Sequence, residues 1–448
     1  MSPNRRTSRR HFLQAGSLAA ALPAAAQVKL SANDKVQIAL IGAGGMGSGD
    51  IEYERTIPGV KLVAVADVYD GRLERAKEKW GRDLFTTRDF REVLARKDVD
   101  AVVIATPDHW HAPITIEALN AGKHVYCEKP MIHSIDEGKP VIAAHKKSGK
   151  IMQIGSQYAS SLIFLKARDL MKTGAIGELN MVEAWLDRNT ALGAWQYSIP
   201  PDASPKTIDW DRFLGKAPKR PFEAVRMFRW RNYNDYGTGV AGDLFVHLFT
   251  GIHTVTGALG PTRVFASGGL RFWKDGRDAP DVMLGVVDYP KTQEHPEFSL
   301  SLKVNFVSGI AKESFGVRFI GSEGVMTTTM AELKLSRVPR ESEPGYTIGT
   351  FPKAVQEQFL KEYYEKYPQT APSADAIRPE RTEVYVPPPS HSAHREHHVN
   401  FQNGIRTGKP HFEDSTFGLR TAGPALLCNT SYFERRATTW DPQTMTAA

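Results

Sequence analysis

Short apolar runs alternate with helical segments along the first part of the chain. Residues 36–41 and 60–66 are compact β-branched and aliphatic runs, which are typical of buried strands. Helical patterns separate three further strands, predicted at 101–105, 124–127 and 151–154. Strands separated by helices predict a doubly wound parallel sheet, in which ligands bind at the carboxyl ends of the strands.

The pattern changes from about residue 179. Apolar and polar residues alternate in several later segments, as in half-exposed antiparallel strands. We predict strands at 179–187, 263–268, 282–289, 298–306, 313–320 and 325–329, and helices at about 393–406 and 415–435. The fold class is therefore α/β with a second α+β domain, built on a large, mostly antiparallel sheet and expected over residues 158–440.

A glycine-rich turn joins the first strand to the helix that follows it. Gly42 permits the tight turn, Gly44 lets the backbone approach a pyrophosphate, and Gly47 lets the helix pack against the strand. Met46 belongs to the same turn, and the N-terminus of the helix offers free N–H groups to phosphates. Asp67 closes the second strand, where its carboxylate can bond ribose hydroxyls and repel a 2′-phosphate. This order predicts a dinucleotide-binding Rossmann domain over residues 33–157, with NAD favoured over NADP.

Two loops follow the ends of later strands and should face the cofactor. The first spans residues 106–111 and contains Thr106, Pro107 and His109. The second is the turn formed by Glu128, Lys129 and Pro130. Parallel strands present their carboxyl ends at one edge of the sheet, so both loops are candidates for cofactor contacts.

An aspartate and a histidine are spaced by four residues in the second domain. If Asp243 begins a helix, Asp243 and His247 lie on one face, where the pair can tune a proton-transfer group. Asp243 can instead be a helix N-cap, with His247 in the core. The spacing alone leaves both interpretations open.

The first 26 residues are typical of a signal peptide. Arg9 and Arg10 precede a Phe-Leu pair and a short alanine-rich apolar run, which indicates the twin-arginine export route. We therefore expect a periplasmic protein with no membrane span once the signal is removed. Four of the seven net positive charges come from arginines of this segment, which leaves +3 spread along the rest of the chain. No Lys/Arg block remains, so we expect no nucleic-acid partner.

Other metal or redox signals are weak. Cys127 and Cys428 form no disulfide framework, and we interpret them as two buried, inert thiols. Four histidines include helical spacing suited to a metal, but no nearby acid or cysteine clearly completes the set, so we predict no metal site. They are His391, His394, His397 and His398.

These motifs together resemble those of a known family. The early glycine fingerprint, the Glu128-Lys129-Pro130 turn and the spacing of Asp243 and His247 are similar to the glucose–fructose oxidoreductase, inositol dehydrogenase and rhizopine-catabolism (Gfo/Idh/MocA) family, over roughly residues 35–435. The signal segment resembles that of an exported branch of this family.

The resemblance implies roles for individual residues. It places Lys129, Asp243 and His247 around the substrate carbon beside the nicotinamide, with His247 as base, and it implies that Pro130 fixes the turn, with a cis bond as one option. It also places Gln157 at the nicotinamide pocket. Dehydrogenases of the family often carry an Asp three residues after the histidine, where this chain has Thr250.

Three functions compete at this point. The first is hydride transfer between NAD and a hydroxyl of a sugar, glycoside or polyol. The second is redox-neutral glycoside cleavage or elimination with a retained cofactor, which export favours because free NAD is scarce outside the cytoplasm. The third is a non-catalytic nucleotide- or sugar-binding module. The resemblance to the family further implies a homo-oligomer, because an open sheet face commonly mediates dimers or tetramers in that family.

Overall fold

The computed structural model describes residues 35–310, 312–337, 344–368 and 381–447. The predicted signal peptide, residues 1–26, lies outside the described residues. Within the described ranges, no helix is both long and apolar enough to cross a membrane.

The first sheet contains six strands, all parallel, in the order β3-β2-β1-β4-β5-β6. Its strands are β1 Val36–Ile41, β2 Val60–Ala66, β3 Phe85–Thr87, β4 Ala101–Ile104, β5 His124–Glu128 and β6 Met152–Gly155. The order reverses at β1, so the carboxyl ends of β1 and β4 flank the crevice where ligands bind in such sheets. The predicted parallel sheet is therefore confirmed, and the short edge strand β3 is an addition to it.

Helices cover both faces of this sheet, because its strands are apolar on both sides. Ile38 and Leu40 of β1 belong to one buried cluster with residues of α2 and α3, whereas Ala39 and Ile41 belong to another with residues of α5 and α6. The helices are α2 Gly45–Glu54, α3 Asp70–Trp80, α4 Phe90–Leu94, α5 His111–Asn120 and α6 Gly138–Ser148. Helix α12, Ala393–Thr407, comes late in the chain and packs beside α2.

The second sheet contains ten strands in the order β14-β13-β12-β11-β7-β10-β9-β8-β15-β16. All of its pairs within the described residues are antiparallel except β7 with β10, which is parallel. Its strands are β7 Leu179–Arg188, β8 Arg263–Gly269, β9 Val282–Tyr289, β10 Phe298–Asn305, β11 Glu313–Gly321, β12 Gly324–Thr329, β13 Leu333–Arg337, β14 Arg381–Tyr385, β15 Thr438–Asp441 and β16 Thr446–Ala447. The expected large, mostly antiparallel sheet is confirmed.

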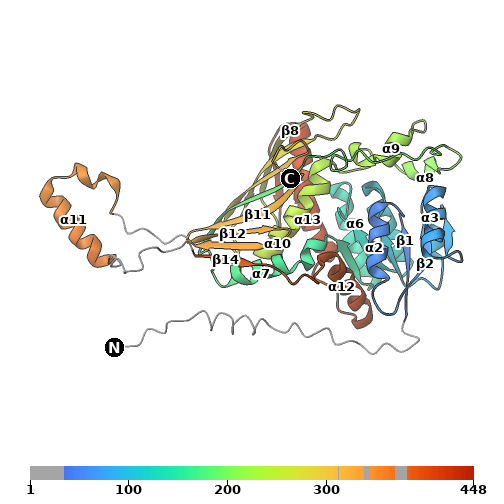
Figure 1. Cartoon of the computed structure of the whole chain (residues 1–448), viewed down its shortest axis with the longest axis horizontal. Coiled ribbons are helices and arrows are strands. Elements are labelled where there is room, and N and C mark those ends of the chain that lie inside the picture. The colour runs from blue at the N-terminus through green and yellow to red at the C-terminus, as the bar shows by residue number, and fades with distance from the viewer. Residues whose placement is uncertain (1–34, 311, 338–343, 369–380, 448) are drawn as a thin grey trace.

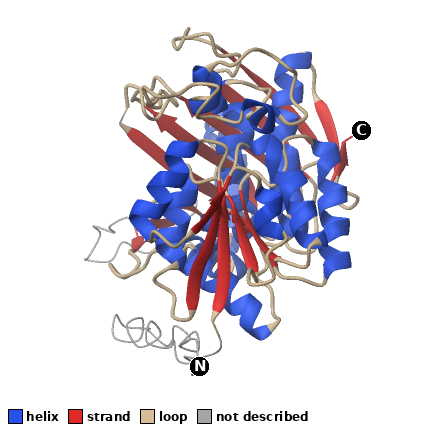
Figure 2. Ribbon diagram, turned by 90° about the vertical axis from the view of Figure 1, so that its right-hand side faces the viewer, coloured by secondary structure: helices blue, strands red, loops and turns tan. Residues whose placement is uncertain are grey.

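Three helices pack on one face of the second sheet. Figure 2 shows the strands of the first sheet with helices on both sides of them. The three helices on the second sheet are α7 Leu162–Lys172, α10 Val246–Thr256 and α13 Ser415–Glu434. A fourth helix, α11 Lys353–Lys366, follows β13 in the chain. On the sheet, side chains such as Val264 and Val287 are buried, whereas Phe265 and Val286 are exposed, as the predicted alternation requires.

A long connection between β7 and α10 extends to the first domain, as Figure 1 shows near α3. It contains the short helices α8 Trp210–Leu214 and α9 Ala224–Phe228. We call residues 198–236 the covering segment. Its apolar side chains form a cluster with Tyr69 of the first domain, which holds the segment beside the carboxyl ends of the parallel strands.

Candidate functional site

Two glycines of the turn after β1, Gly42 and Gly47, have no space for a side chain. Gly42 has a φ of +95°, and a Cβ there would lie 2.6 Å from the carbonyl oxygen of Ala105. A Cβ on Gly47 would lie 2.2 Å from the carbonyl oxygen of Gly42 and 3.0 Å from Leu40. No side chain caps the N-terminus of α2. The turn therefore brings bare backbone and helix N–H groups to the sheet edge, which fits a dinucleotide pyrophosphate.

Asp67 is held at the end of β2 beside this turn. Its Oδ2 accepts from the backbone N–H of Ala43 at 2.8 Å, and its Oδ1 accepts from that of Tyr69 at 3.0 Å. Arg72 Nη1 lies 3.4 Å from Oδ2. These contacts fix the carboxylate where the sequence places the ribose of the cofactor.

A cavity of about 1140 Å³ extends from the glycine turn to the second domain. Six of the predicted cofactor residues line it: Gly42, Gly44, Met46, Asp67, Thr106 and Pro107. The covering segment supplies further walls, among them Phe213, Phe228 and Arg231. This volume is slightly above the roughly 300–1,000 Å³ of small-molecule pockets, which leaves space for a dinucleotide.

His109, predicted as a cofactor contact, does not line this cavity. Its ring lies 2.9 Å from the carbonyl oxygen of Phe213 and 3.3 Å from that of Tyr236. Burial lowers its pKa to about 4, so the ring is neutral. His109 therefore joins its loop to the covering segment.

Glu128 and Gln157 are buried and contact each other. Gln157 Nε2 donates to Glu128 Oε1 at 2.8 Å and to the hydroxyl of Tyr126 at 3.3 Å. Burial raises the pKa of Glu128 well above its usual value. Both were predicted as cofactor contacts, but neither lines the cavity.

Lys129, at the end of β5, meets Asp243 from the second domain. Lys129 Nζ donates to the carbonyl oxygen and to Oδ1 of Asp243, both at 2.8 Å. Arg231 Nε lies 3.2 Å from the same Oδ1. Burial alone would raise the pKa of Asp243, but Lys129 and Arg231 outweigh it and hold that pKa below its usual range. Asp243 therefore stays ionised between two cations.

Arg231 connects this buried group to the cavity, because its side chain also lines the cavity wall. The sequence analysis did not identify Arg231 as a site residue. Residue type alone does not separate Arg231 from the many other arginines of the chain. Only the fold brings it to Asp243.

His247 lies one turn after Asp243 and is partly buried. Its ring packs against Tyr158, with centroids 5.1 Å apart. Burial, followed by the charge of Lys129, lowers its pKa well below the usual value, so the imidazole is neutral at neutral pH. Its Nδ1 has no hydrogen-bond partner among the described residues.

The local helix geometry decides between the two interpretations of Asp243. Residues 241–245 form a π-helical turn that runs directly into α10, so Asp243 is not an N-cap. Its carboxylate contacts Lys129 and Arg231. Single π-helical turns within α-helices are frequent at functional sites. The side chain of Thr250, in contrast, donates to the carbonyl oxygen of Val246 and is fully buried.

The Lys129–Pro130 peptide bond is cis. Each ring nitrogen of His111 contacts a backbone carbonyl of a site loop, Pro130 at 2.6 Å and Thr106 at 2.9 Å. The two predicted loops are therefore tied together by one buried histidine.

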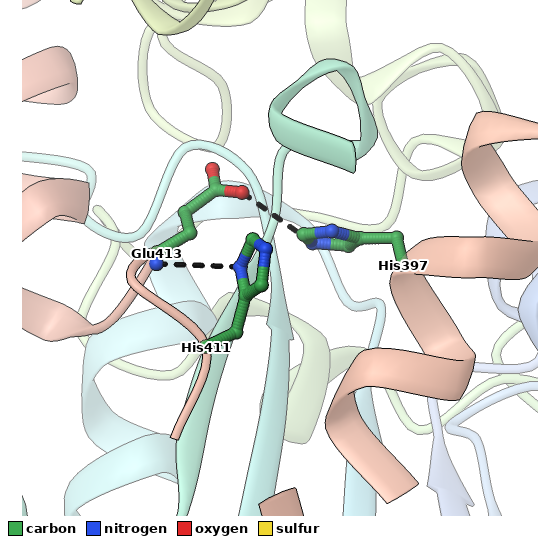
Figure 3. A group of neighbouring side chains, drawn as sticks. All are labelled: His397, His411 and Glu413. Atoms are coloured by element: carbon green, nitrogen blue, oxygen red, sulfur yellow. Dashed lines mark hydrogen bonds and ion pairs between the residues drawn. The ribbon is translucent and has the colours of Figure 1, made fainter. Parts of the chain in front are cut away.

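The four histidines near residue 391 point to different partners. His391 accepts from the backbone of Leu162, His394 stacks on Tyr53, and His398 lies between two buried carboxylates. His397 is brought near His411 and Glu413 instead, as Figure 3 shows. The sequence pattern therefore does not describe one cluster.

In the group of Figure 3, hydrogen bonds occupy both nitrogens of His397. Nδ1 lies 2.8 Å from Ser160 Oγ, and Nε2 lies 2.7 Å from the carbonyl oxygen of Ile154. Figure 3 marks the longer contact of Nε2 with Glu413 Oε2, at 3.5 Å. Because a carbonyl only accepts, Nε2 carries the proton and is not free to bind a metal. Burial raises the pKa of Glu413 well above its usual value, which keeps this acid neutral.

His398 belongs to a separate buried network. Its Nδ1 lies 2.9 Å from Glu54 Oε1, and its Nε2 lies 3.3 Å from Asp50 Oδ1. Burial lowers the pKa of His398, but these two carboxylates outweigh it and raise that pKa to about 10. The ion pairs join α12 to α2 behind the glycine turn.

The predicted inert cysteines are confirmed as buried, free thiols. Burial raises the pKa of Cys127 to about 12, which keeps the thiol protonated. Neither thiol is poised for nucleophilic chemistry.

Comparison with known proteins agrees with this geometry for the first domain. Residues 36–156 match the model described as oxidoreductase family, NAD-binding Rossmann fold. The inositol 2-dehydrogenase of Salmonella typhimurium is 33% identical over 145 residues, which are 32% of this chain and 43% of that protein. The resemblance to the Gfo/Idh/MocA family and the NAD-binding character of the first domain are thereby confirmed.

Two other similar proteins are a sequence relative and a solved structure. A glycosyl hydrolase family 109 protein of Shewanella sp. is 32% identical over 182 residues, 36% of this chain and 40% of that protein. A levoglucosan dehydrogenase structure with NADH and levoglucosan has a TM-score of 0.64 at 18% identity, covering 90% of this chain and 99% of that one. The likeness to the solved structure shows the fold of both domains, whereas the chain spans less than half the length of these curated relatives.

Proposed function

We propose, taking the membership of the first domain in the Gfo/Idh/MocA oxidoreductase family as the premise, that this protein oxidises a hydroxyl of a sugar, glycoside or polyol by hydride transfer to NAD. One observation carries the proposal. Lys129, from the loop at the end of a cofactor-domain strand, binds Asp243 of the second domain, and Arg231 joins the pair to the cavity that begins at the glycine turn.

The residues suit dehydrogenation of a carbinol carbon. Bound NAD would supply the hydride acceptor. Neutral His247 accepts the hydroxyl proton, since a neutral imidazole keeps one ring nitrogen free to accept. Lys129 donates a hydrogen bond to the same oxygen and stabilises the negative charge that develops there. Asp243, held ionised, fixes the position of Lys129.

The remaining assigned residues would hold the cofactor. Gly42, Gly44 and Met46 line the pyrophosphate end, and Asp67 receives the ribose hydroxyls. In the mature chain, residues 33–157 bind NAD and residues 158–440 bind the carbohydrate.

A substrate panel tests this function directly. The mature protein, loaded with NAD, is offered sugars, glycosides and cyclitols, and NADH formation is followed by absorbance. Net NADH formation that His247→Ala abolishes is the expected result. Stoichiometric NAD binding with no turnover on any carbohydrate would instead leave only a binding module.

A second function, redox-neutral cleavage of a glycoside with a retained cofactor, is favoured by the covering segment. Tyr69 Oη donates to Asp202 Oδ1 at 2.6 Å, and the backbone N–H of Asp209 donates to the carbonyl oxygen of Val68 at 2.9 Å. Arg212 of the segment pairs with Asp89 at 3.1 Å. These contacts hold the segment to the domain that binds the cofactor, which opposes exchange of the cofactor.

The two functions differ in cofactor content and in products. Protein purified after native export is dialysed, quenched with acid and assayed for NAD. Near-stoichiometric NAD together with glycoside cleavage and no net NADH identifies the redox-neutral cycle. Empty protein that forms NADH when NAD and sugar are added identifies an ordinary dehydrogenase.

We also propose that residues 1–26 direct twin-arginine export to the periplasm and that the mature protein is a homo-oligomer. Replacing Arg9 and Arg10 by lysine should retain the protein in the cytoplasm. Light scattering of the exported protein measures the number of subunits.

A further inference from the structure

We infer that the substrate is an acidic sugar, a uronic acid or its glycoside, whose carboxylate is received by Arg188 beside the reacting carbon. The inference rests on the proposed function and names the substrate class for the same site. It comes from an excess of positive charge where the cavity wall formed by Arg188, Arg231 and Lys312 approaches the buried Asp243, which itself does not line the cavity.

Four cationic side chains lie at this end of the site. Lys129 and Arg231 share the single carboxylate of Asp243. Arg188 and Lys312 line the cavity wall, together with Glu313. His247 is neutral. Asp243 and Glu313 pair with these cations, Asp108 also acts on Arg231, and burial raises the pKa of the neighbouring Glu128 well above its usual value. At most three ionised carboxylates therefore face four cations. An oxidised nicotinamide ring would add one more positive charge, so an anion bound here is electrostatically favoured.

Glu313 compensates Arg188 poorly. Arg188 Nε lies 3.4 Å from Glu313 Oε1, and the glutamate side chain is 62% exposed. Solvent screens a pair of this kind. Arg188 Nη1 donates to the carbonyl oxygen of Gly193 at 3.3 Å, and its Nη2 has no hydrogen-bond partner among the described residues. The guanidinium is therefore fixed by its neighbours and keeps donors available for a carboxylate.

Arg188 and Arg72 line the cavity from different domains. Arg72 lies 3.7 Å from the Cβ position of Gly44, beside the glycine turn of the first domain. Arg188 instead ends β7 in the second domain. Burial and the charge of Lys129 lower the pKa of His247, Asp243 raises it, and the charge of Arg188 lowers it further.

Arg231 and Lys312 support the same ligand. Arg231 uses Nε for Asp243, and its guanidinium stacks over Trp230 at 4.2 Å while lining the cavity. Lys312 forms no ion pair within the part of the chain that the structure describes. A sugar carboxylate that meets Arg188 would neutralise this group without displacing Asp243 from Lys129.

The experiment compares matched sugars that differ only in the carboxylate. NAD-loaded protein is offered methyl glycosides of glucose, galactose and mannose and of the corresponding uronic acids, and kcat/KM for disappearance of the glycoside is measured. We expect at least one uronide to exceed its neutral partner about tenfold or more, the ratio that about 1.4 kcal/mol supplies. The preference should fall as salt is added.

Arg188→Met should move this ratio toward one. Arg318→Met is the matched control, because Arg318 lies on β11, pairs with Glu183 at 2.8 Å and does not line the cavity; it should keep the ratio of the unaltered protein. If every neutral glycoside is converted as well as its uronide, the inference is overturned and the proposed function stands. An Arg188→Met variant that retains the preference has the same consequence. Conversion of no sugar by protein that holds NAD overturns both.

Discussion

Lys129→Met is the substitution that tests the proposed chemistry most sharply. The side chains of Lys129 and Asp243 are 10% and 6% exposed, so the pair is nearly withdrawn from water. Breaking such a pair costs about 3–5 kcal/mol of folding free energy. Arg231 remains 3.2 Å from the carboxylate, so we expect the lower end, about 3 kcal/mol.

The effect on turnover should be separate from the effect on stability. Loss of a positioned proton-transfer and oxyanion-binding group slows the chemical step by about 10²–10⁴, equivalent to about 3–5 kcal/mol in the barrier. The assay is kcat with the sugar that the unaltered protein converts fastest, normalised to the folded fraction measured by urea unfolding.

Lys123→Met provides the matched control within the same domain. Lys123 is 8% exposed and donates to the carbonyl oxygens of Arg96 and Val99, at 2.7 and 2.8 Å. Leaving these two acceptors unpaired should cost about as much stability as the loss of Lys129, but kcat per folded molecule should not change. A folded Lys129→Met variant with more than about a tenth of normal turnover would refute the role of Lys129.

Four other predictions concern single residues. His398→Asn should lower the free energy of unfolding by about 3 kcal/mol. Because the pKa of His398 in the folded protein is raised to about 10, the stabilisation by His398 is complete below about pH 6.5 and is lost as pH rises to about 10. Urea unfolding at several pH values will measure this loss. Gly42→Ala should abolish NAD binding in calorimetry, because its Cβ would lie 2.6 Å from the Ala105 oxygen; normal affinity would contradict the turn assignment. Tyr69→Phe removes the bond to the covering segment and should speed NAD release about tenfold; an unchanged release rate in stopped flow would show that the segment does not retain NAD. Because the pKa of His247 is well below its usual value, kcat/KM should not decline as pH is lowered from about 8 to 6; a decline centred near pH 6.5 would exclude it as the base.

The sequence predicted the parts of the fold that depend on local pattern. The buried run 60–66 matches β2 in both bounds, and the glycine turn lies where its spacing placed it. The alternating runs 263–268 and 282–289 correspond to β8 and β9. The short strands β13 and β14 were not predicted, because five-residue pairs with mixed composition carry little periodicity.

The site was predicted where it depends on a motif and was missed where it depends on tertiary contacts. Lys129 and Asp243 are 114 residues apart in the chain. Only the resemblance to the family predicted that they would lie close together. Arg231 and Arg188 carry no local signal, because their role comes from the cavity that they line. His109 follows a strand end like a cofactor contact, yet its ring turns to the covering segment.

The covering segment also has a consequence for the order of synthesis. All six strands of the first sheet end by residue 155, before residues 198–236 leave the ribosome. The crevice can therefore form in a nascent chain while its later wall is still absent. NAD that enters at that stage becomes enclosed without any opening motion, whereas protein refolded first and supplied with NAD afterwards must admit it past the finished wall. Biosynthetic and refolded samples of one sequence should thus differ in how quickly they become loaded.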